Sequence, residues 1–403
     1  MSAGGPEGTR GSGPPLRRAM RGRDPAEEHR ASTPLELLFD LTFVVAVSQA
    51  AGRLHHALAE GHPGTGLAGY AAVFFAIWWA WMNFTWFASA YDTDDVLYRT
   101  LTLVQMAGVL VLASGVPAAF RDGDFTVVVA GYVLMRLALI TQWLRAAAEH
   151  RERRGTALRY AAGIAVVQCG WIAREWAAGT WLPVTFVLLV AAELAVPAWA
   201  EAGGRATGWH PQHIAERYGL FTIIVLGEVI LASLTAVQAA VTAHGLTTSV
   251  LLIAVGGLLL VFSLWWIYFT GDDVTLTTLR TALTWGYGHY VGFAAVAALG
   301  AGLEAALAAA EHHAHLSPRA AGLAVAVPAA VVLLLFGFLH RLARTGAVRH
   351  PLLVVAGAAI VPALGCAPPL IGLGPAVLAM GLTVTAVLAA DVAALHRAAV
   401  RTV

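Results

Sequence analysis

Three charged side chains lie deep inside long apolar stretches of the sequence: Arg136, Glu193 and Glu228. A charge within a membrane costs at least about 2.5–3.5 kcal/mol on insertion scales, so it normally faces a partner or a water-filled cavity. Arg136 can neutralise either Glu228 or Glu193. The carboxyl left over is then expected to be neutral at rest, as in a proton-coupled site. The structural alternative is an ion pair that fixes helix register, beside one protonated Glu hydrogen-bonded to a carbonyl.

Two further carboxylates, Glu36 and Asp40, are four residues apart and therefore share one helical face. Thr33, a proline and Glu36 form the pattern of a capping box, which explains Glu36 without any chemistry. Asp40 lies one turn deeper, where a cap is not needed. We therefore expect Asp40 to line a pathway, with Asp391 of the last apolar stretch as a potential neighbour.

Aspartate pairs precede two of the apolar stretches, Asp94-Asp95 before the third and Asp272-Asp273 before the ninth. Carboxylates at helix N-termini complement the helix dipole, and this is the favoured interpretation. The functional alternative is a cytoplasmic mouth that attracts cations.

Histidines are the remaining groups with chemical potential. His289 lies inside an apolar stretch, where a hydrogen-bonded packing role is favoured over a proton relay. Three His-rich groups, near positions 55–62, 210–216 and 311–315, could bind metal, but none has a defined frame of ligands. We therefore predict no metal site and no cofactor.

Composition identifies the class of protein. Hydrophobic residues make up 58% of the chain, charged residues only 12%, and the mean hydropathy is +0.70. A soluble chain usually carries about 25% charged residues, so the expected partner is the lipid bilayer. The net charge of +1 argues against nucleic acid. The two cysteines provide no disulfide framework.

Twelve stretches are long and apolar enough to cross a bilayer, and all must be helices because lipid cannot satisfy an open backbone. Stretches five and eleven fit this criterion least well. The predicted fold is thus an all-α polytopic bundle of about 12 spans. The stretches are 34–59, 66–90, 99–120, 124–147, 157–178, 181–200, 214–240, 246–270, 280–308, 319–344, 351–371 and 374–396.

Arginine supplies all 25 basic side chains, and its distribution is strongly biased. Twenty fall in or near the N-terminal tail, the even-numbered gaps and the C-terminal tail, and four fall in or near the odd-numbered gaps. By the positive-inside rule, both termini are predicted to be cytoplasmic, in a bacterial inner membrane. Residues 1–30 are Gly-, Pro- and Arg-rich, and they predict a disordered cytoplasmic tail.

The two halves of the chain share an order of motifs. A Leu-Phe pair, a Trp pair and an Asp-Asp-Val segment begin at residues 38, 78 and 94, and again at 220, 265 and 272. Six spans are an even number, so a second copy has the same orientation as the first, a plan known among transporters. We expect a parallel repeat of residues 31–205 and 206–403. Chance recurrence in a Trp-rich membrane chain is the alternative.

Two segments resemble a known family. One reads PLELLFDLTFV from Pro34 to Val44, and the other reads AERYGLF from Ala215 to Phe221, running on to Gly227-Glu228. With the Trp-rich second stretch, they resemble the bacterial low temperature requirement A family. The resemblance implies a polytopic inner-membrane protein named for growth in the cold, and it supplies no substrate.

Two functions remain open. The first is a secondary transporter or channel-like carrier for a small solute or ion, with pathway candidates Asp40, Glu228, Arg136, Glu193, Glu36 and His289. The second is a non-transport protein that supports the envelope or growth in the cold by binding lipid or a partner. An enzyme is not predicted, because the sequence contains no nucleophile elbow, phosphate-binding glycine loop or His-Glu-x-x-His helix.

Overall fold

The computed structural model describes residues 15–24, 27, 30–177, 179–202, 207–270, 274–311, 314–343 and 350–401, and these residues form helices connected by short loops. Thr33, Asp95, His210, Thr247 and Thr278 each accept a backbone N–H at the start of a helix, which satisfies an orphan donor. The first six long helices are α1 (Pro34–Ala59), α2 (Pro63–Tyr91), α3 (Val96–Asp122), α4 (Thr126–Glu149), α5 (Arg154–Arg174) and α6 (Trp181–Ala202).

The second half of the chain also consists of long helices, with one short helix among them. Its helices are α7 (Pro211–His244), α8 (Thr248–Phe269), α9 (Leu279–Ala310), α10 (Pro318–Ala343), α11 (Pro351–Gly365), α12 (Pro368–Ile371) and α13 (Leu373–Arg401). All twelve predicted stretches coincide with a helix, so the all-α prediction is confirmed.

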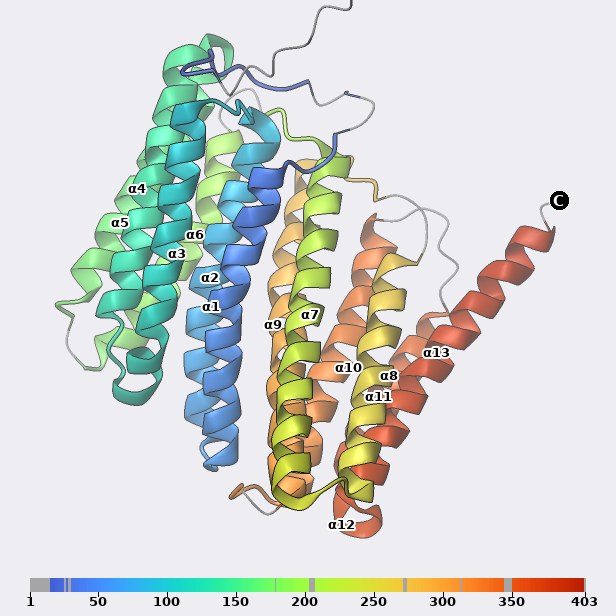
Figure 1. Cartoon of the computed structure of the whole chain (residues 1–403). Helices are drawn as coiled ribbons and strands as arrows, with labels where there is room; N and C mark the ends of the chain where they lie inside the picture. The colour runs from blue at the N-terminus through green and yellow to red at the C-terminus, as the bar shows by residue number, and fades with distance from the viewer. Residues whose placement is uncertain are drawn as a thin grey trace, which may run out of the picture.

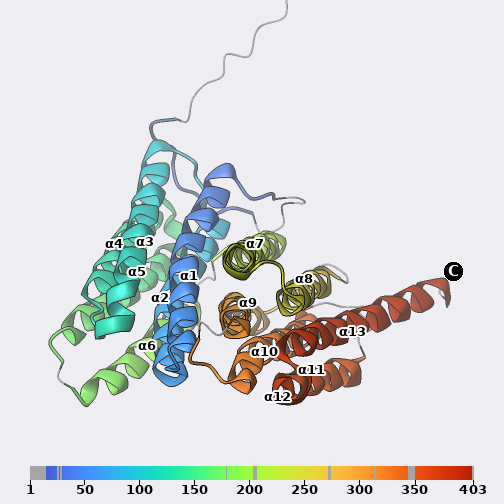
Figure 2. The same ribbon diagram turned by 60° about the horizontal axis from the view of Figure 1, so that its bottom comes forward.

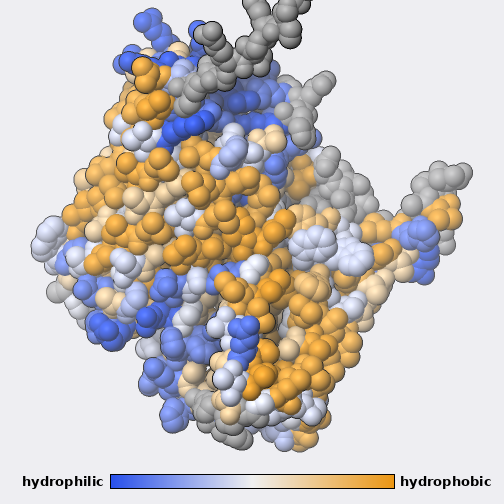
Figure 3. All heavy atoms as spheres, in the orientation of Figure 1, coloured by the Kyte–Doolittle hydropathy of each residue, from blue (hydrophilic) through white to orange (hydrophobic). Residues whose placement is uncertain are grey.

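Ten of the described helices are long and apolar enough to cross a membrane. α5 and α11 do not meet this standard, and they correspond to the two stretches that fitted the sequence criterion least well. Figure 3 shows a broad hydrophobic band around the middle of the bundle, with hydrophilic residues gathered above and below it. This arrangement is the surface expected of a protein that spans a bilayer.

Successive long helices run in alternating directions, so that α1 begins and α13 ends on the same side of the bundle (Figure 1). This side also holds the starts of α3, α5 and α7 and the ends of α4 and α10. The densest arginine group, at the junction of α4 and α5, therefore lies on the side of the N-terminal segment. We call this the tail side, and the other the far side.

The bundle has two groups of helices, α1–α6 and α7–α13, that meet along a junction (Figure 2). α1 and α2 of the first group pack against α7 and α9 of the second. Within each group, glycines allow close approach of backbones. A Cβ at Gly108 of α3 would come within 2.9 Å of the Gly131 carbonyl oxygen of α4, and one at Gly256 of α8 within 2.6 Å of the Val377 carbonyl oxygen of α13. Small residues serve this purpose in membrane proteins.

Part of the predicted N-terminal tail packs against the tail side of the bundle. Met20 is fully buried, and its N–H donates to Glu149 of α4 at 2.6 Å. The Arg30 guanidinium donates to the Ala88 carbonyl near the end of α2 at 2.7 Å. The Glu27 carbonyl accepts from His210 Nε2 at 2.8 Å. The described part of this segment therefore connects α2 and α4 with the start of α7.

Candidate functional site

A group of four charged or titratable side chains is buried where α1 meets α7, on the tail side of the junction. We call Glu36, Asp40, His213 and Arg217 the junction cluster. Asp40, His213 and Arg217 are 0% exposed and Glu36 is 1% exposed. The two segments that carry the family resemblance thus contact each other through their charged residues.

Arg217 is the centre of the junction cluster. Its Nε donates to Asp40 Oδ2 at 3.0 Å and its Nη2 to Asp40 Oδ1 at 2.5 Å, which is a bidentate pair. Its Nη1 lies 3.0 Å from Glu36 Oε1. Trp81 of α2 donates its indole N–H to Asp40 Oδ1 at 2.7 Å. A bidentate guanidinium–carboxylate pair adds geometric specificity to charge neutralisation, so this cluster joins α1 to α7 in the present arrangement of the helices.

Glu36 has the capping role considered from the sequence, and it also contacts the second group of helices. The capping box is present: Thr33 N–H donates to Glu36 Oε2 at 2.8 Å, and Glu36 N–H donates to the Thr33 hydroxyl at 3.3 Å. The same carboxylate lies 3.3 Å from His213 Nε2. The predicted neighbour Asp391 is absent from this cluster; it accepts from the His350 N–H at 3.4 Å, and α13 does not pack against α1.

An aromatic layer lies next to the junction cluster on its far side. The Trp81 ring stacks on Phe221 of α7 with centroids 4.3 Å apart, and Phe293 of α9 contacts Phe221 at 5.0 Å. Phe43 and Val47 on α1 are also fully buried. We call these five buried side chains the aromatic floor; Phe43 and Val47 follow Asp40 along α1, and Phe221 follows Arg217 along α7.

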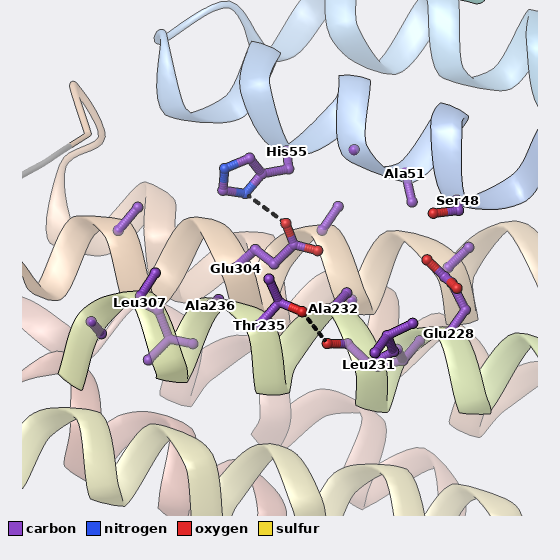
Figure 4. Close-up of a pocket in the computed structure, with 18 of the residues that line it drawn as sticks. Ser48, Ala51, His55, Glu228, Leu231, Ala232, Thr235, Ala236, Glu304 and Leu307 are labelled. Carbon is purple, nitrogen blue, oxygen red and sulfur yellow. Dashed lines mark hydrogen bonds and ion pairs between the residues drawn. The ribbon is translucent and has the colours of Figure 1, made fainter. Parts of the chain in front are cut away.

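Further along the same helices, α1, α7 and α9 line an open cavity of about 490 Å³. Ser48, Gly52 and His55 line it from α1, Glu228 and Thr235 from α7, and Gly300 and Glu304 from α9, among many alanines. Figure 4 shows that Glu228, Glu304 and His55 all reach the cavity from different helices. Glu228 is 11 residues from Arg217, or about 16 Å along the α7 axis. The cavity therefore lies on the far side of the junction cluster, along the same two helices.

Two of the carboxylates that line the cavity, Glu228 and Glu304, differ in their partners. His55 Nδ1 lies 3.5 Å from Glu304 Oε2, and both side chains are about one-fifth exposed. Glu228 is partly buried, and no hydrogen bond or ion pair joins it to any described residue. Glu228 is thus the carboxyl that Arg136 leaves unpaired, as one of the two alternatives predicted, and it faces open space instead of a carbonyl.

Arg136 and Glu193 form another buried ion pair, inside the first helix group. Arg136 Nη2 lies 3.3 Å from Glu193 Oε2. Three neutral donors complete the Glu193 carboxylate: the Tyr132 hydroxyl at 2.7 Å, the Trp79 indole at 2.8 Å and the Trp171 indole at 3.3 Å. We call these five residues the first-half cluster. The Arg136 and Glu193 side chains are 1% and 2% exposed, and none of the five residues lines the cavity.

His289 has the packing role favoured from its sequence. Its Nδ1 lies 2.8 Å from the Trp285 carbonyl, which can only accept, so Nδ1 carries the proton. Nε2 then accepts from the Tyr268 hydroxyl at 3.0 Å. The contact with Tyr268 joins α9 to α8. His289 is fully buried and lies outside the cavity lining.

The aspartates at the start of α3 are occupied by local contacts. Asp95 accepts from Tyr98 N–H at 2.9 Å as the helix cap and from Arg145 of α4 at 2.9 Å. Asp94 pairs with Arg99 at 2.7 Å. Asp272 and Asp273 lie outside the described residues, so the proposed cation-attracting mouth there has no structural description.

Asp92 and Asp95, which lie between α2 and α3, differ in the direction of their pKa shifts. Burial raises the pKa of Asp92 to about 6, with the nearby Glu36 charge acting in the same direction and Arg30 and Arg23 opposing it. Burial also disfavours the charged form of Asp95, but hydrogen bonds from Arg145 and two backbone N–H groups prevail and lower its pKa to about 2. Asp92 therefore titrates near neutral pH whereas Asp95 remains ionised.

The predicted histidine groups are dispersed in the structure. His210 accepts the His213 N–H as the α7 cap, His213 contacts Glu36, and His55 contacts Glu304. Within the described residues, no group of three or more His, Cys, Asp or Glu side chains could hold a metal ion. His312 and His313 lie outside those residues.

Sequence reasoning missed three participants: Arg217, Glu304 and Trp81. Arg217 stands three residues into stretch seven, where it counts as an interfacial arginine. Glu304 stands four residues from the end of stretch nine, where a carboxylate can reach water. The available signal was spacing, because Glu36, Asp40, Ser48 and His55 follow one face of α1 from the cluster to the cavity.

Comparisons with known proteins agree with this picture. The family model described as "Bacterial low temperature requirement A protein (LtrA)" matches residues 31–389. A relative from Rhizobium meliloti (strain 1021), described as "Uncharacterized protein RA0937", is 31% identical over 223 residues. That alignment spans 52% of this chain and 52% of the relative, so the chain matches about half the relative's length.

Proposed function

This chain belongs to the bacterial low temperature requirement A family, and we propose that it is a secondary carrier for a small solute or ion. The proposed route lies between α1, α7 and α9. It uses Glu228 and Glu304 in the cavity and the junction cluster beneath them. The observation that carries the proposal is the cavity of about 490 Å³ itself, because carboxylates that line an open space inside a membrane bundle typically mark a substrate or ion pathway.

The position of the cavity supports transport. It lies between two groups of helices, which is where carriers bind their substrates and where one group can rock against the other. The cavity is on the far side, while the aromatic floor and the junction cluster fill the tail side. This asymmetry is the form expected of one of the two end states in alternating access. Separation of α1 from α7 would open the other end.

The packing of the helices supports a six-plus-six repeat. α1 packs on α2 and α3, α3 on α4, α4 on α5 and α5 on α6; the same order recurs as α7 with α8 and α9, then α9–α10, α10–α11 and α11–α13. The repeat is imperfect: α8 and α13 pack closely, whereas α2 and α6 have no comparable contact, and Trp265 and Trp266 are exposed while Trp78 and Trp79 are buried. We propose that α5 and α11 also cross the membrane, giving twelve spans.

The alternation of helices and the arginine bias support the proposed orientation. The tail side, with both termini, is the cytoplasmic side of a bacterial inner membrane, and the cavity then opens toward the periplasm. The proposal includes the bilayer as the essential partner and assigns the chain no enzymatic reaction.

The test is an exchange of small molecules across proteoliposomes. Vesicles containing the wild-type protein are loaded with an unlabelled bacterial metabolite extract and placed in an isotopically labelled extract. Mass spectrometry then identifies solutes that exchange faster than in empty vesicles. We expect at least one such solute, and we expect Glu228→Gln or Asp40→Asn to slow its exchange about tenfold or more.

Glu175→Gln, at an exposed loop position beyond α5, is the matched control and is expected to exchange at the wild-type rate. If wild-type and empty vesicles do not differ for any solute, the carrier proposal is wrong and the non-transport role in the envelope is favoured. Equal exchange by wild type, Glu228→Gln and Asp40→Asn would remove these carboxylates from the mechanism.

A further inference from the structure

We propose that the cavity between α1, α7 and α9 binds an organic cation, such as a protonated amine with an apolar body. This inference rests on the proposed carrier function and names the substrate class of that same site. Three observations carry it: the sign of the charges lining the cavity, the spacing of those charges, and the character of the remaining wall.

The lining has acidic groups and no arginine. Glu228, Glu304 and Glu311 contribute carboxyl groups, and His55 is the one basic side chain among the lining residues described. His55 is committed to Glu304, while Glu228 has no described partner. An anionic ligand would face repulsion without a guanidinium to receive it. A cation instead supplies the partner that Glu228 lacks, and this is the usual solution for a carboxylate within a membrane.

The spacing of the charges favours an organic cation over a bare metal ion. Glu228, His55 and Glu304 come from three different helices, and they do not converge into a group that could hold a metal among the described residues. A metal ion needs several ligands within about 2.0–2.6 Å. A volume of about 490 Å³ also falls within the range of about 300–1,000 Å³ typical of small-molecule sites.

The rest of the wall suits an apolar body. Small side chains cover it, chiefly alanines such as Ala51, Ala232, Ala236 and Ala297, together with Gly52 and Gly300. The Ser48 and Thr235 hydroxyls are the neutral polar groups; Thr235 already donates to the Leu231 carbonyl at 2.9 Å. A hydrophobic ligand can contact the alanines while its ammonium group lies between Glu228 and Glu304 (Figure 4).

The test uses three probes of similar size and different charge: benzylamine, which is protonated at neutral pH, benzyl alcohol and benzoate. Binding to the purified protein in detergent is measured by titration calorimetry at pH 7. We expect benzylammonium to bind, and the alcohol and benzoate to bind at least about tenfold more weakly. Glu228→Gln and Glu304→Gln should each weaken benzylammonium binding about tenfold or more, because each removes a charge partner.

Glu193→Gln is the matched control, because it removes a buried carboxylate that does not line the cavity, and it should leave binding unchanged. A thermal unfolding curve for each variant separates lost binding from lost folding. Where Glu228→Gln does not fold, Ala236→Leu replaces it, since filling the cavity should block binding by volume alone. Equal binding of all three probes, binding of MnCl₂ in place of benzylammonium, or full benzylammonium binding by both Glu variants would overturn the proposal.

The outcome is separable from that of the carrier proposal. Benzylammonium binding without any solute exchange in proteoliposomes would leave a cation site in a protein that is not a carrier. Exchange restricted to neutral or anionic solutes would leave a carrier whose substrate class is misassigned here.

Discussion

The junction cluster and the first-half cluster both bury an arginine against carboxylate in the membrane bundle, but they differ in completeness and position. Glu193 receives donors from four side chains and lies within one group of helices. Arg217 serves two carboxylates at once and joins two groups of helices. A carboxylate that accepts from four side chains within one group of helices holds that group together. A shared cation across a junction can separate and re-form when the groups move.

Their surroundings show the same contrast. The first-half cluster is enclosed by Trp79, Trp171 and Tyr132, and it does not line the 490 Å³ cavity. The junction cluster lies behind the aromatic floor and is followed by that cavity along α1 and α7. Burial of a charged residue alone therefore does not identify a functional site. A better guide is whether the residue lies at the junction of the two helix groups and next to the cavity.

The largest expected effect comes from removing each arginine. Arg217→Met leaves Glu36 and Asp40 without a cation, and breaking a buried pair costs about 3–5 kcal/mol of folding stability. Arg136→Met leaves one carboxylate that keeps three neutral donors, so we expect a loss of about 1.5–3 kcal/mol, the value of hydrogen bonds to a charged group. Thermal unfolding in detergent, followed by tryptophan fluorescence, should rank Arg217→Met below Arg136→Met. The reverse order would contradict the assignment of Arg217 as the shared cation.

A smaller effect is expected when both charges of a pair are removed. Arg136→Met with Glu193→Gln should recover most of the stability lost in Arg136→Met, because replacing a buried ion pair by neutral groups is often neutral or stabilising. Arg217→Met with Asp40→Asn should recover less, because Glu36 remains charged. Equal recovery in the two double variants would show that Glu36 does not depend on Arg217.

The smallest effect is a pH dependence that separates two neighbouring aspartates. The folded-state pKa of Asp92, about 6, lies above its usual 3.8, so its contribution to stability is complete below about pH 4 and is lost as the pH rises through 6. Asp95, with a folded-state pKa of about 2, contributes stability above pH 4 that is lost as the pH falls through 2. Between pH 4 and 7, Asp92→Asn should therefore flatten the fall in unfolding temperature seen in wild type, whereas Asp95→Asn should lower that temperature throughout. An unchanged pH profile in Asp92→Asn would exclude Asp92 as its source.

Much of the fold could be predicted because lipid imposes one solution on an apolar stretch of sufficient length. The same depth argument gave Glu193 and Glu228 as the two candidate partners of Arg136, and it could not choose between them; the structure pairs Arg136 with Glu193. Depth did not identify Arg217 or Glu304, because each lies near the end of its helix, where a charge can also reach water. The sequence could not predict which helices are neighbours. Asp391 lies at a similar depth to Asp40, but depth does not say which helices are in contact.

A carrier of this design needs its cavity to be open to water while the protein is in the membrane. In a background where Cys169 and Cys366, both exposed, are replaced by serine, Ser48→Cys places a thiol on the cavity wall and Ala138→Cys places one on α4 near Arg136. Intact cells are treated with a membrane-impermeant thiol reagent. We predict rapid labelling of Ser48→Cys, slowed by benzylamine, and no labelling of Ala138→Cys. An unreactive thiol at position 48 in a folded protein would contradict a water-filled pathway between the two groups of helices.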